Sequence, residues 1–428
     1  MNEEDRTRLE EFRQFKKEIR GSGEYLIVGI DVAKDKHHAF FGMATGKTLL
    51  RRLVFDNNIE GFERLLVQVE ALKVQQGLRQ VVFGLEPTAN YHKPLGEHLI
   101  RCGHKVVLVS GVAVKENRKS LDGRWDKHDV QDAANVADLL CQGKCLFYEY
   151  PEVVVRDLRD LLSLKRRLKR MEHGMRVRIR NHLVAKYFPE LDRYYERSES
   201  GSLGIVRWCL DPSVIAGLEY GQFAQRVAPG KRRLSQESRL QAIWKLAVDS
   251  IGCEVGSAVE FEGKVMVEGL KQIREVLQAT EEKIEEICSP FPEYSCLQSI
   301  PGFGPDVSAK VLGAIGDPFR FQDGKQVLKL AGLDLNAERS GKTSEAAVPV
   351  ISKKGKADLR YALYQAAFIA SSKNQGFMVY YTHKLRGRER EPGIKTKMRV
   401  KLAAKLLIMA WTLMKKKESF NPDYLNVE

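Results

Sequence analysis

The stretch YLIVGIDVAKDK, residues 25–36, decides the fold that we predict for the N-terminal part of this chain. Its apolar run from Leu26 to Ile30 is short and rich in β-branched residues, which favours a buried central strand over a helix. The run ends on Asp31, so a carboxylate stands where a core strand opens to solvent. Since Asp is also common at strand ends for turn chemistry alone, Asp31 becomes a candidate site residue only if other carboxylates reach the same edge.

The composition limits the class of protein. A chain of 428 residues should hold two or three domains with sizeable cores. Its 70 Lys and Arg against 56 Asp and Glu make a formal net charge of +14, so a polyanionic partner is expected. No segment has the roughly 18 apolar residues of a membrane-spanning helix, and the first residues are charged rather than signal-like. The seven cysteines are odd in number and scattered, which favours a reducing cytoplasm over a disulfide framework.

Alternating strands and helices follow the first strand, as in a mixed sheet with helices packed on it. The expected elements are strands at 38–44, 48–55, 81–85 and 105–109 and helices at 59–74 and 91–101. The strand at 81–85 ends on Glu86, and Pro87 stops it. Glu86 is therefore a second carboxylate at the exit of a buried strand.

Two more carboxylates lie in the segment DKHDVQDAANVADLL, residues 126–140. Its apolar residues recur at helical spacing, and Asp129 and Asp132 share a neighbouring face, although the helix dipole alone also favours acidic residues at a helix N-terminus. Any two carboxylates within about 5 Å repel by roughly 3 kcal/mol at an effective dielectric constant near 20. Four such groups would share a site only with cations or raised pKa values. Magnesium is the expected ion, because carboxylate oxygens suit it and it can bridge phosphate oxygens.

Three motifs carry a family resemblance. GIDVAK at 29–34, LEPTANY at 85–91 and KHDVQDA at 127–133, in this order and on these elements, resemble the N-terminal domain of DEDD-type insertion-sequence transposases. In that family the domain is RuvC-like, a branch of the ribonuclease H fold, and the resemblance covers roughly residues 24–150. It implies a metal-binding catalytic tetrad of Asp31, Glu86, Asp129 and Asp132.

The middle of the chain is expected to be helical and strongly basic. Apolar residues recur at three- and four-residue steps over 158–179, as in a coiled coil, and Lys and Arg surround them, among them Arg166, Arg167 and Arg170. Such a charge run is often only a solvated face, but the scarcity of acidic residues here favours nucleic-acid contact. A second apolar seam over 270–287, flanked by glutamates, should return antiparallel and discourage nucleic-acid binding on that flank.

The segment LQSIPGFGPDVSAKVLGAIGD, residues 297–317, reads as a helix-hairpin-helix. Backbone N–H groups of its hairpin, around Gly302 and Gly304, can bind a phosphate without base specificity. A tight turn without a ligand is the alternative.

A polar loop at 337–344 places Ser340 directly before Gly341. A serine beside glycine is accessible to a phosphate, although such a pair taken alone is most often a turn. Cations that could stabilise the charge of a transferring phosphoryl group, and bind nucleic acid, lie beside or after it: Arg339, Lys342, Lys353, Lys354 and Arg360.

The order IPGFG, AIGD, LAGL, RSGK and ISKKGKADLR, followed by an amphipathic helix, is similar to the C-terminal transposase domain of the same family over roughly residues 293–415. The resemblance implies that Ser340 is the nucleophile that forms a covalent phosphoserine link with DNA. It also implies a structured bridge RNA encoded by the element, and dimers or tetramers in which the tetrad of one protomer meets the serine domain of another.

The expected fold class is α/β plus α. A charged N-terminal arm at 1–23, solvated or flexible, precedes the RuvC-like catalytic domain at 24–150. A helical coiled-coil region at 151–292 follows, and a mostly helical C-terminal domain at 293–428 holds the helix-hairpin-helix and the serine loop.

The leading hypothesis is a DNA transposase of an insertion sequence, with Mg²⁺, DNA, a structured guide RNA and further copies of the chain as partners, on the nucleoid of a bacterial or archaeal cytoplasm. One alternative is a structure-selective, metal-dependent endonuclease resembling Holliday-junction resolvases, in which water is the nucleophile and Ser340 is structural. The second alternative is a non-catalytic nucleic-acid-binding scaffold, whose binding would be indifferent to magnesium.

Overall fold

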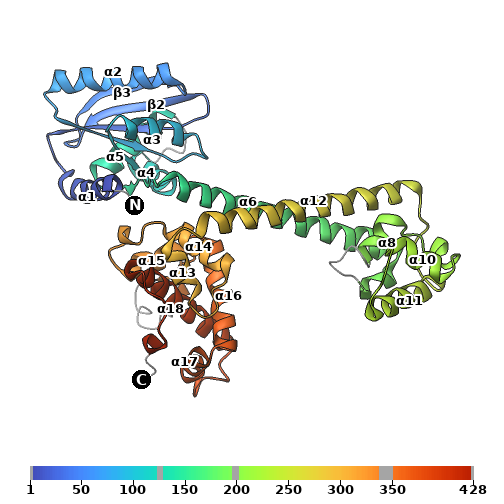
Figure 1. Cartoon of the computed structure of the whole chain (residues 1–428). Coiled ribbons are helices and arrows are strands. Elements are labelled where there is room, and N and C mark those ends of the chain that lie inside the picture. The colour runs from blue at the N-terminus through green and yellow to red at the C-terminus, as the bar shows by residue number, and fades with distance from the viewer. Residues whose placement is uncertain (1–2, 123–128, 195–201, 337–349, 426–428) are drawn as a thin grey trace. The chain divides into compact units, whose positions relative to one another are not determined.

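The computed structural model describes residues 3–122, 129–194, 202–336 and 350–425 (Figure 1). These residues belong to two compact units, Met1–Glu152 and Val153–Glu428. Among the helices of these ranges, none is both long and apolar enough to cross a lipid bilayer.

The first unit is built on a six-stranded mixed sheet with the order β3-β2-β1-β4-β5-β6. The first three strands form the antiparallel meander, whereas β1, β4 and β5 are parallel and β6 returns antiparallel at the edge. The bounds are β1 (Tyr25–Asp31), β2 (Lys36–Met43), β3 (Thr48–Asp56), β4 (Gln80–Leu85), β5 (Lys105–Leu108) and β6 (Leu146–Phe147). The five strands expected from the sequence are confirmed, with ends shifted by at most two residues.

Helices cover both faces of the sheet (Figure 1). Successive strand residues point to opposite faces, so Leu26, Val28 and Ile30 enter one core and Tyr25 and Ile27 enter another. Helices α2 (Ile59–Gln76) and α3 (His92–Arg101) complete the first core. Helices α1 (Glu3–Glu18), α4 (Gly111–Asp122) and α5 (Asp129–Cys141) complete the second.

The N-terminal helix α1 corrects one expectation. The charge density of residues 1–23 predicts a solvated helix or a flexible arm, but α1 packs on the sheet. Phe15 is 2% exposed, Ile19 is fully buried, and the ring of Phe15 meets the edge of Tyr25 at 5.5 Å between centroids. The apolar residues of α1 recur every three or four residues, which is the spacing of one helix face, and the many charges around them obscure this stripe.

Two glycines let α5 lie directly against the central strands. A Cβ atom on Gly29 would lie 2.5 Å from the backbone nitrogen of Ala137, and one on Gly84 would lie 2.9 Å from a methyl carbon of Leu140. Gly29 and Gly84 are paired across β1 and β4. A larger residue in place of Gly29 would therefore push α5 off the sheet, whereas one in place of Gly84 would require the Leu140 side chain to move.

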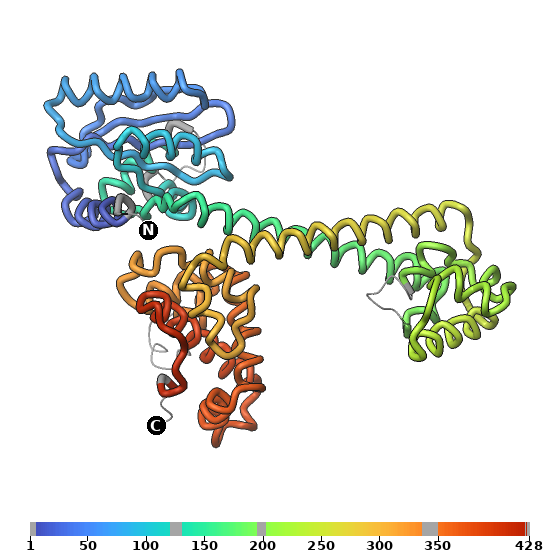
Figure 2. The backbone as a smooth tube through the Cα atoms, in the orientation of Figure 1, coloured from blue at the N-terminus to red at the C-terminus, as the bar shows by residue number. Residues whose placement is uncertain are grey.

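In the second unit, two long helices lie side by side and antiparallel (Figures 1 and 2). They are α6 (Val153–Arg178) and α12 (Ser257–Cys288), and Leu168, Ile273 and Leu277 pack between them. Lys165 pairs with Glu281 and Glu172 with Arg274, so rising numbers on one helix meet falling numbers on the other. This is the pairing that the two apolar seams predict.

The segment between these helices, to which the sequence assigns no chemistry, forms a helical group with its own core. Phe188 and Phe223 are fully buried there, and Trp244 donates its indole N–H to the Leu218 carbonyl at 3.0 Å. The group contains a π-helical turn (Ile179–Val184), α7 (Ala185–Tyr187), a 3₁₀ turn (Pro189–Tyr194), α8 (Ser202–Trp208), α9 (Pro212–Ala216), α10 (Tyr220–Val227) and α11 (Leu234–Val248).

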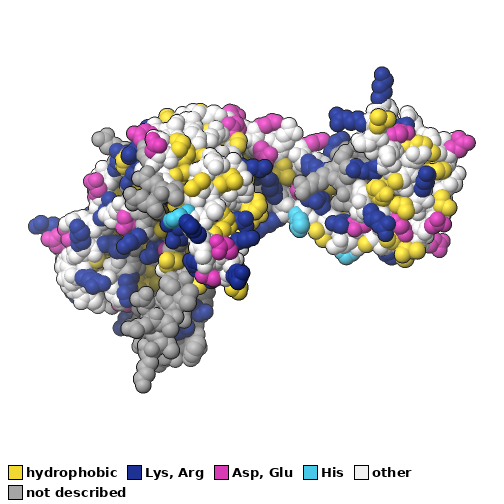
Figure 3. Space-filling view, turned by 90° about the horizontal axis from the view of Figure 1, so that it is seen from below, with side chains coloured by type: hydrophobic (Ala, Val, Ile, Leu, Met, Phe, Trp, Pro, Cys, Tyr) yellow, Lys and Arg dark blue, Asp and Glu magenta, His cyan; other side chains and the backbone are white. Residues whose placement is uncertain are grey.

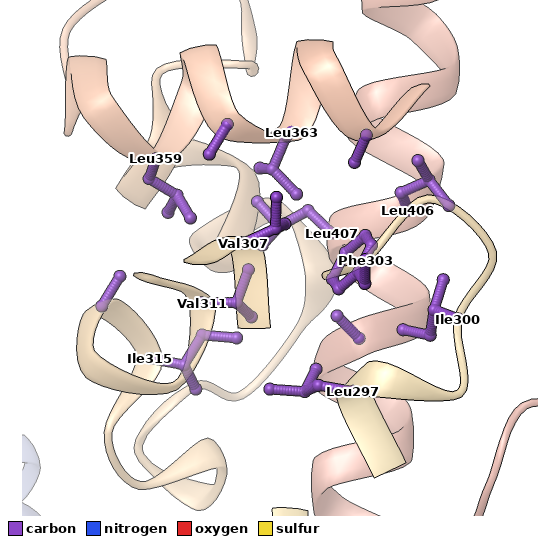
Figure 4. Packing of buried hydrophobic residues seen from close by; sticks show 14 of the residues in the cluster. Leu297, Ile300, Phe303, Val307, Val311, Ile315, Leu359, Leu363, Leu406 and Leu407 are labelled. Atoms are coloured by element: carbon purple, nitrogen blue, oxygen red, sulfur yellow. The ribbon is translucent and has the colours of Figure 1, made fainter. Parts of the chain in front are cut away.

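The C-terminal part of the second unit surrounds one apolar core (Figure 4). The hairpin and α14 contribute Phe303 and Val307, which pack with Leu363 of α16 and Leu406 of α18, and Leu158 of α6 joins them. The bounds are α13 (Pro292–Gln298), α14 (Pro305–Ile315), a 3₁₀ turn (Pro318–Arg320), α15 (Gly324–Ala331), β7 (Leu335–Asn336), β8 (Val350–Ile351), α16 (Ala357–Lys373), α17 (Gln375–Leu385), α18 (Ile394–Lys416) and a last 3₁₀ turn (Pro422–Leu425).

Candidate active site

Two of the expected site residues, Asp31 and Glu86, lie at the ends of two strands that are paired with each other. The parallel strands β1 and β4 pair Ile30 with Leu85, and the Glu86 N–H donates to the Ile30 carbonyl at 3.3 Å. Asp31 and Glu86 follow Ile30 and Leu85 on their strands, so the two carboxylates start from adjacent positions at the same edge.

Helix α5 directs its N-terminal end to that edge. At its other end, the thiol of Cys141 donates to the Met43 carbonyl at 3.7 Å, and Met43 pairs with Leu26 near the start of β1. The middle of the helix, at Ala133, lies against Gly29. Because the C-terminal end of α5 meets the beginning of β1, its N-terminal end must lie toward the strand's end, where the first two carboxylates are.

The structure describes the side chain of Asp132 on α5 but only the backbone of Asp129. The backbone of Asp129 begins the helix, while its side chain lies outside the described part of the structure. Asp132 is 2% exposed, and its carboxylate accepts a hydrogen bond from Nη2 of Arg118 on α4. This ion pair supplies the positive charge that a buried carboxylate requires.

Arg118 is a candidate site residue that no motif in the sequence indicates. It belongs to a segment between two motifs, and nothing in its spacing connects it with Asp132. Its neighbour Asn117 donates to the side chains of Asn135 and Asp138, at 3.1 and 2.9 Å. Helices α4 and α5 are therefore joined by a row of polar contacts beside the carboxylate edge.

Glu86 is held at the beginning of α4. A Cβ atom on Gly111 would lie 2.7 Å from Oε1 of Glu86, and Gly111 is the first residue of α4. The positive end of the helix dipole favours a carboxylate at this position. A side chain in place of Gly111 would require the end of the Glu86 side chain to move.

The donor set fits a divalent cation. Asp31, Glu86 and Asp132 come from three elements whose ends are directed to one edge, and carboxylate oxygens are the ligands of hard divalent ions. Within the described side chains, however, no three His, Cys, Asp or Glu residues are already arranged as a metal-binding group. Asp132 pairs with Arg118 in this arrangement, and the Nε atom of Arg118 is buried without a hydrogen-bond partner.

The expected nucleophile Ser340, with Arg339 and Lys342, lies outside the described residues, but the base of its loop is described. Strands β7 and β8 pair antiparallel on either side of 337–349. Below them the hydroxyl of Ser352 donates to the Asp334 carboxylate at 2.5 Å. The ends of the loop are therefore held together by both backbone and side-chain contacts.

Arg360 has a structural contact at this base. Its Nη1 donates to the carbonyls of Ala331 at 2.8 Å and Lys353 at 3.4 Å. A Cβ atom on Gly355 would lie 2.7 Å from the Leu330 carbonyl oxygen, and Lys353 adopts a φ of +55°, which is uncommon for a non-glycine residue. Lys354 is exposed beside them.

The hairpin glycines also have packing roles. Gly302 has a φ of +91°, and a Cβ atom there would overlap the Ala366 carbonyl of α16. Gly304 is exposed and directly precedes α14, but Asp306 in the first turn accepts from Lys165 and from Lys310, both at 2.6 Å. Burial tends to raise the pKa of Asp306, yet the two lysines outweigh it and lower that pKa. A carboxylate of the chain itself thus lies near the helix end where a phosphate was expected.

The three basic residues expected to contact nucleic acid on α6 differ in their contacts. Arg166 pairs with Asp358 of α16 at 2.6 Å, whereas Arg167 and Arg170 are exposed. On the flank that faces α12, Glu281 contacts Lys165 and Lys169 at 2.9 and 3.5 Å. This flank is partly neutralised, as the glutamates of the second seam predict.

Comparison with known proteins identifies the family. Residues 28–189 match a model of DEDD transposases of the IS110 type, and residues 294–382 match the model described as the transposase IS116/IS110/IS902 family. The carboxylate edge and the base of the serine loop fall within these matches. The DEDD class of domain suggests dependence on a divalent metal.

Relatives extend the similarity over most of the chain. An uncharacterized 43.6 kDa protein of insertion element IS110 from Streptomyces coelicolor is 22% identical over 364 residues, 83% of this chain and 86% of its own length. An uncharacterized 44.8 kDa protein of insertion element IS116 from Streptomyces clavuligerus is 22% identical over 92% of this chain and 96% of its own length. The pilin gene-inverting protein of Moraxella bovis is 23% identical over 92% of this chain and 97% of its own length. Since both halves of the family pattern occur in order on one chain, the protein is a DNA transposase that belongs to the IS116/IS110/IS902 family.

Proposed function

We propose that this transposase cuts and rejoins DNA through a covalent phosphoserine intermediate on Ser340, assisted by Mg²⁺ held by four carboxylates. The ligands would be Asp31, Glu86, Asp129 and Asp132. The observation that best supports the proposal is the parallel pairing of β1 with β4, which starts Asp31 and Glu86 from adjacent positions. The direction of α5 supports adding its two aspartates to the same edge.

The fold supports a finer assignment of the domains. An antiparallel meander followed by parallel strands, with α5 lying across β1 and β4, agrees with a RuvC-like ribonuclease H fold at 24–150. We assign a coiled-coil region to 151–292, on the pairing of α6 with α12, and a domain with a helix-hairpin-helix and the serine loop to 293–428.

In the proposed reaction, the Oγ atom of Ser340 attacks the scissile phosphorus. A bond forms between phosphorus and Oγ, the bond from phosphorus to a deoxyribose oxygen breaks, and the serine proton passes to that leaving oxygen through a carboxylate or water. A free hydroxyl of the partner strand then attacks the phosphoserine, which restores the serine and rejoins the DNA. Magnesium, when bound, would polarise the phosphate and favour ionisation of the hydroxyl. Arg339 and Lys342 would stabilise the added charge on the phosphate oxygens.

The base of the loop supports this role for Ser340, because catalytic groups need rigid support. Strands β7 and β8 and the Arg360 hydrogen bonds hold the two ends of 337–349 together. The nucleophile would thus be presented from a fixed base.

The proposal includes partners beyond DNA. The net charge of +14 supports a polyanionic partner, and the family resemblance points to a structured guide RNA and to dimers or tetramers. We place this assembly on the nucleoid of a bacterial or archaeal cytoplasm.

Denaturing electrophoresis of full-length protein with labelled element-end DNA, candidate RNA and Mg²⁺ tests the proposal. Wild type and Ser344→Ala should form a labelled protein–DNA band that withstands denaturation, and Ser340→Ala and Asp129→Ala should not. Cleavage by Ser340→Ala without any covalent band in wild type would support the metal-dependent nuclease with water as nucleophile. Unchanged DNA binding without cleavage by any form, with or without Mg²⁺, would support the scaffold.

A further inference from the structure

A hollow of about 970 Å³ lies in the second unit between α6, α14 and the beginning of α16. We call it the α6 groove. On its α6 wall, Arg159, Arg166, Arg170 and His173 recur at intervals of three, four or seven residues, which places them along one helix face. At about 1.5 Å of rise per residue this stripe is roughly 20 Å long.

The groove is strongly positive. Seven Lys or Arg side chains line it, five from α6 together with Lys310 and Lys356, against a single carboxylate, Asp358. Glu281 and Asp306 pair with lining lysines from outside the groove. Even when these two acids are counted, four positive charges remain in excess.

This charge is concentrated in a hollow rather than merely spread over a surface. In the space-filling view, dark blue Lys and Arg side chains are scattered over the face that is drawn (Figure 3), so a single exposed cation has no special meaning. Between the two long helices, Glu281 of α12 pairs with Lys165 of α6, and Glu172 of α6 pairs with Arg274 of α12. Among the cations of α6 that line the groove, Lys165 and Lys169 contact Glu281 and Arg166 contacts Asp358, and the excess of four positive charges already takes these acids into account.

The groove also offers apolar contact. Leu162 and Leu359 contribute to its lining, and the side chain of Tyr361 is 62% exposed although it lines the hollow. An exposed aromatic ring beside a row of cations is the combination by which proteins hold unpaired nucleotides: cations follow the phosphates and a ring stacks on a base. A duplex keeps its bases stacked inside and has none to offer to Tyr361.

We propose that the α6 groove binds the sugar–phosphate backbone of an unpaired segment of nucleic acid, with Tyr361 stacking on one of its bases. The choice of nucleic acid as the ligand rests on the proposed function, because a transposase that pairs a guide with DNA must bind unpaired strands. The same chemistry is present in single-stranded RNA and DNA, and the test distinguishes them.

The test measures fluorescence anisotropy of labelled 12-nucleotide oligo-dT and oligo-rU with full-length protein between 50 and 200 mM salt, without Mg²⁺. Tyr361→Ala should weaken binding by about 5- to 150-fold. Arg170→Gln should weaken it about five-fold near 0.1 M salt and reduce the salt slope by roughly 0.7, the value for one phosphate on a single strand. Lys271→Gln is the control, because Lys271 is exposed on α12 but does not line the groove, and it should bind like wild type.

Equal weakening by Lys271→Gln and Arg170→Gln would overturn the proposal, as would an effect of Tyr361→Ala or Arg170→Gln on blunt duplex alone. Effects confined to oligo-rU or to oligo-dT would support the groove and identify RNA or DNA as its ligand. The covalent-band assay is run on the same variants. If no form makes the band while the binding differences persist, the phosphoserine proposal fails and the groove stands. If Arg170→Gln and Tyr361→Ala bind both oligonucleotides like wild type while the band forms, the groove fails alone.

Discussion

The carboxylate of Asp132 is buried in the interior of the first unit. Among the described residues, its charged partner is the guanidinium of Arg118. Removing one partner of a buried ion pair leaves an uncompensated charge, which usually costs about 3–5 kcal/mol. Arg118→Met should therefore lower the free energy of unfolding by about that amount. A divalent ion that binds only the folded chain stabilises it by mass action, so Mg²⁺ should restore part of the loss.

Thermal unfolding of Arg118→Met with and without Mg²⁺ measures both effects, and Arg118→Lys, which keeps the charge, serves as the control. A variant as stable as wild type would show that the ion pair is of little consequence. A variant that is destabilised but indifferent to Mg²⁺ would argue against a metal at this edge.

Gly29 has no room for a side chain, because its Cα atom faces the backbone of α5. Gly29→Ala should lower the free energy of unfolding by about 1–3 kcal/mol or more, the usual cost of overpacking a core. Gly23→Ala is the control, since nothing lies within 4 Å of a Cβ atom there. Urea unfolding compares the two, and equal midpoints would mean that α5 does not lie as close to β1 as described.

Lys165 connects two elements of the second unit to the long helix that carries it. It is 7% exposed, and it contacts Glu281 of α12 at 2.9 Å and Asp306 of α14 at 2.6 Å. Lys165→Met should lower the free energy of unfolding by roughly 1–3 kcal/mol, less than for a fully buried pair because both carboxylates are partly exposed. Lys169→Met, whose side chain is 57% exposed, should change it by less than about 0.5 kcal/mol.

The same contacts set a pH dependence. Burial opposes the charge of Lys165, but its carboxylate partners outweigh burial and raise its pKa, while the pKa of Asp306 is lowered. A lowered folded-state pKa contributes stability above the ordinary value of 3.8, and this stability is lost as pH falls through the folded-state pKa. The free energies of unfolding of wild type and Lys165→Met, measured in urea from pH 6 to pH 2.5, should thus differ less below about pH 4 than above it. A difference in unfolding free energy that stays constant over this pH range would contradict the predicted pH dependence.

Each compact unit has cores of its own, because no hydrophobic cluster among the described residues contains members of both. Domains with separate cores usually fold alone. Fragments 1–152 and 153–428 should each unfold cooperatively in urea, whereas 190–428, which lacks α6 and cuts the core around Phe188, should not. Loss of a cooperative transition in 153–428 would show that its fold depends on the first unit.

Much of the N-terminal fold could be predicted because its signals are local. Short β-branched runs that end on Asp31 and Glu86 predicted two buried strands of one mixed sheet, and the motifs predicted the family, whereas the pairing of these two strands came from the structure. Helix α1 was predicted less well, since charge density obscured the stripe that includes Phe15. Spacing shows which residues of an element face a core, but not which element covers them.

The sequence by itself determined the family, the order of the elements and the identity of the candidate carboxylates. The spacing of apolar residues and the sequence motifs depend only on residues that are close along the chain. The tertiary structure alone decided that Arg118 balances Asp132, that Gly29 and Gly84 admit α5, and that cations of α6 line a groove with Tyr361. These features join residues that lie between 14 and 202 positions apart along the chain. Their contacts depend on how loops close and helices pack, and no local pattern of residues encodes that.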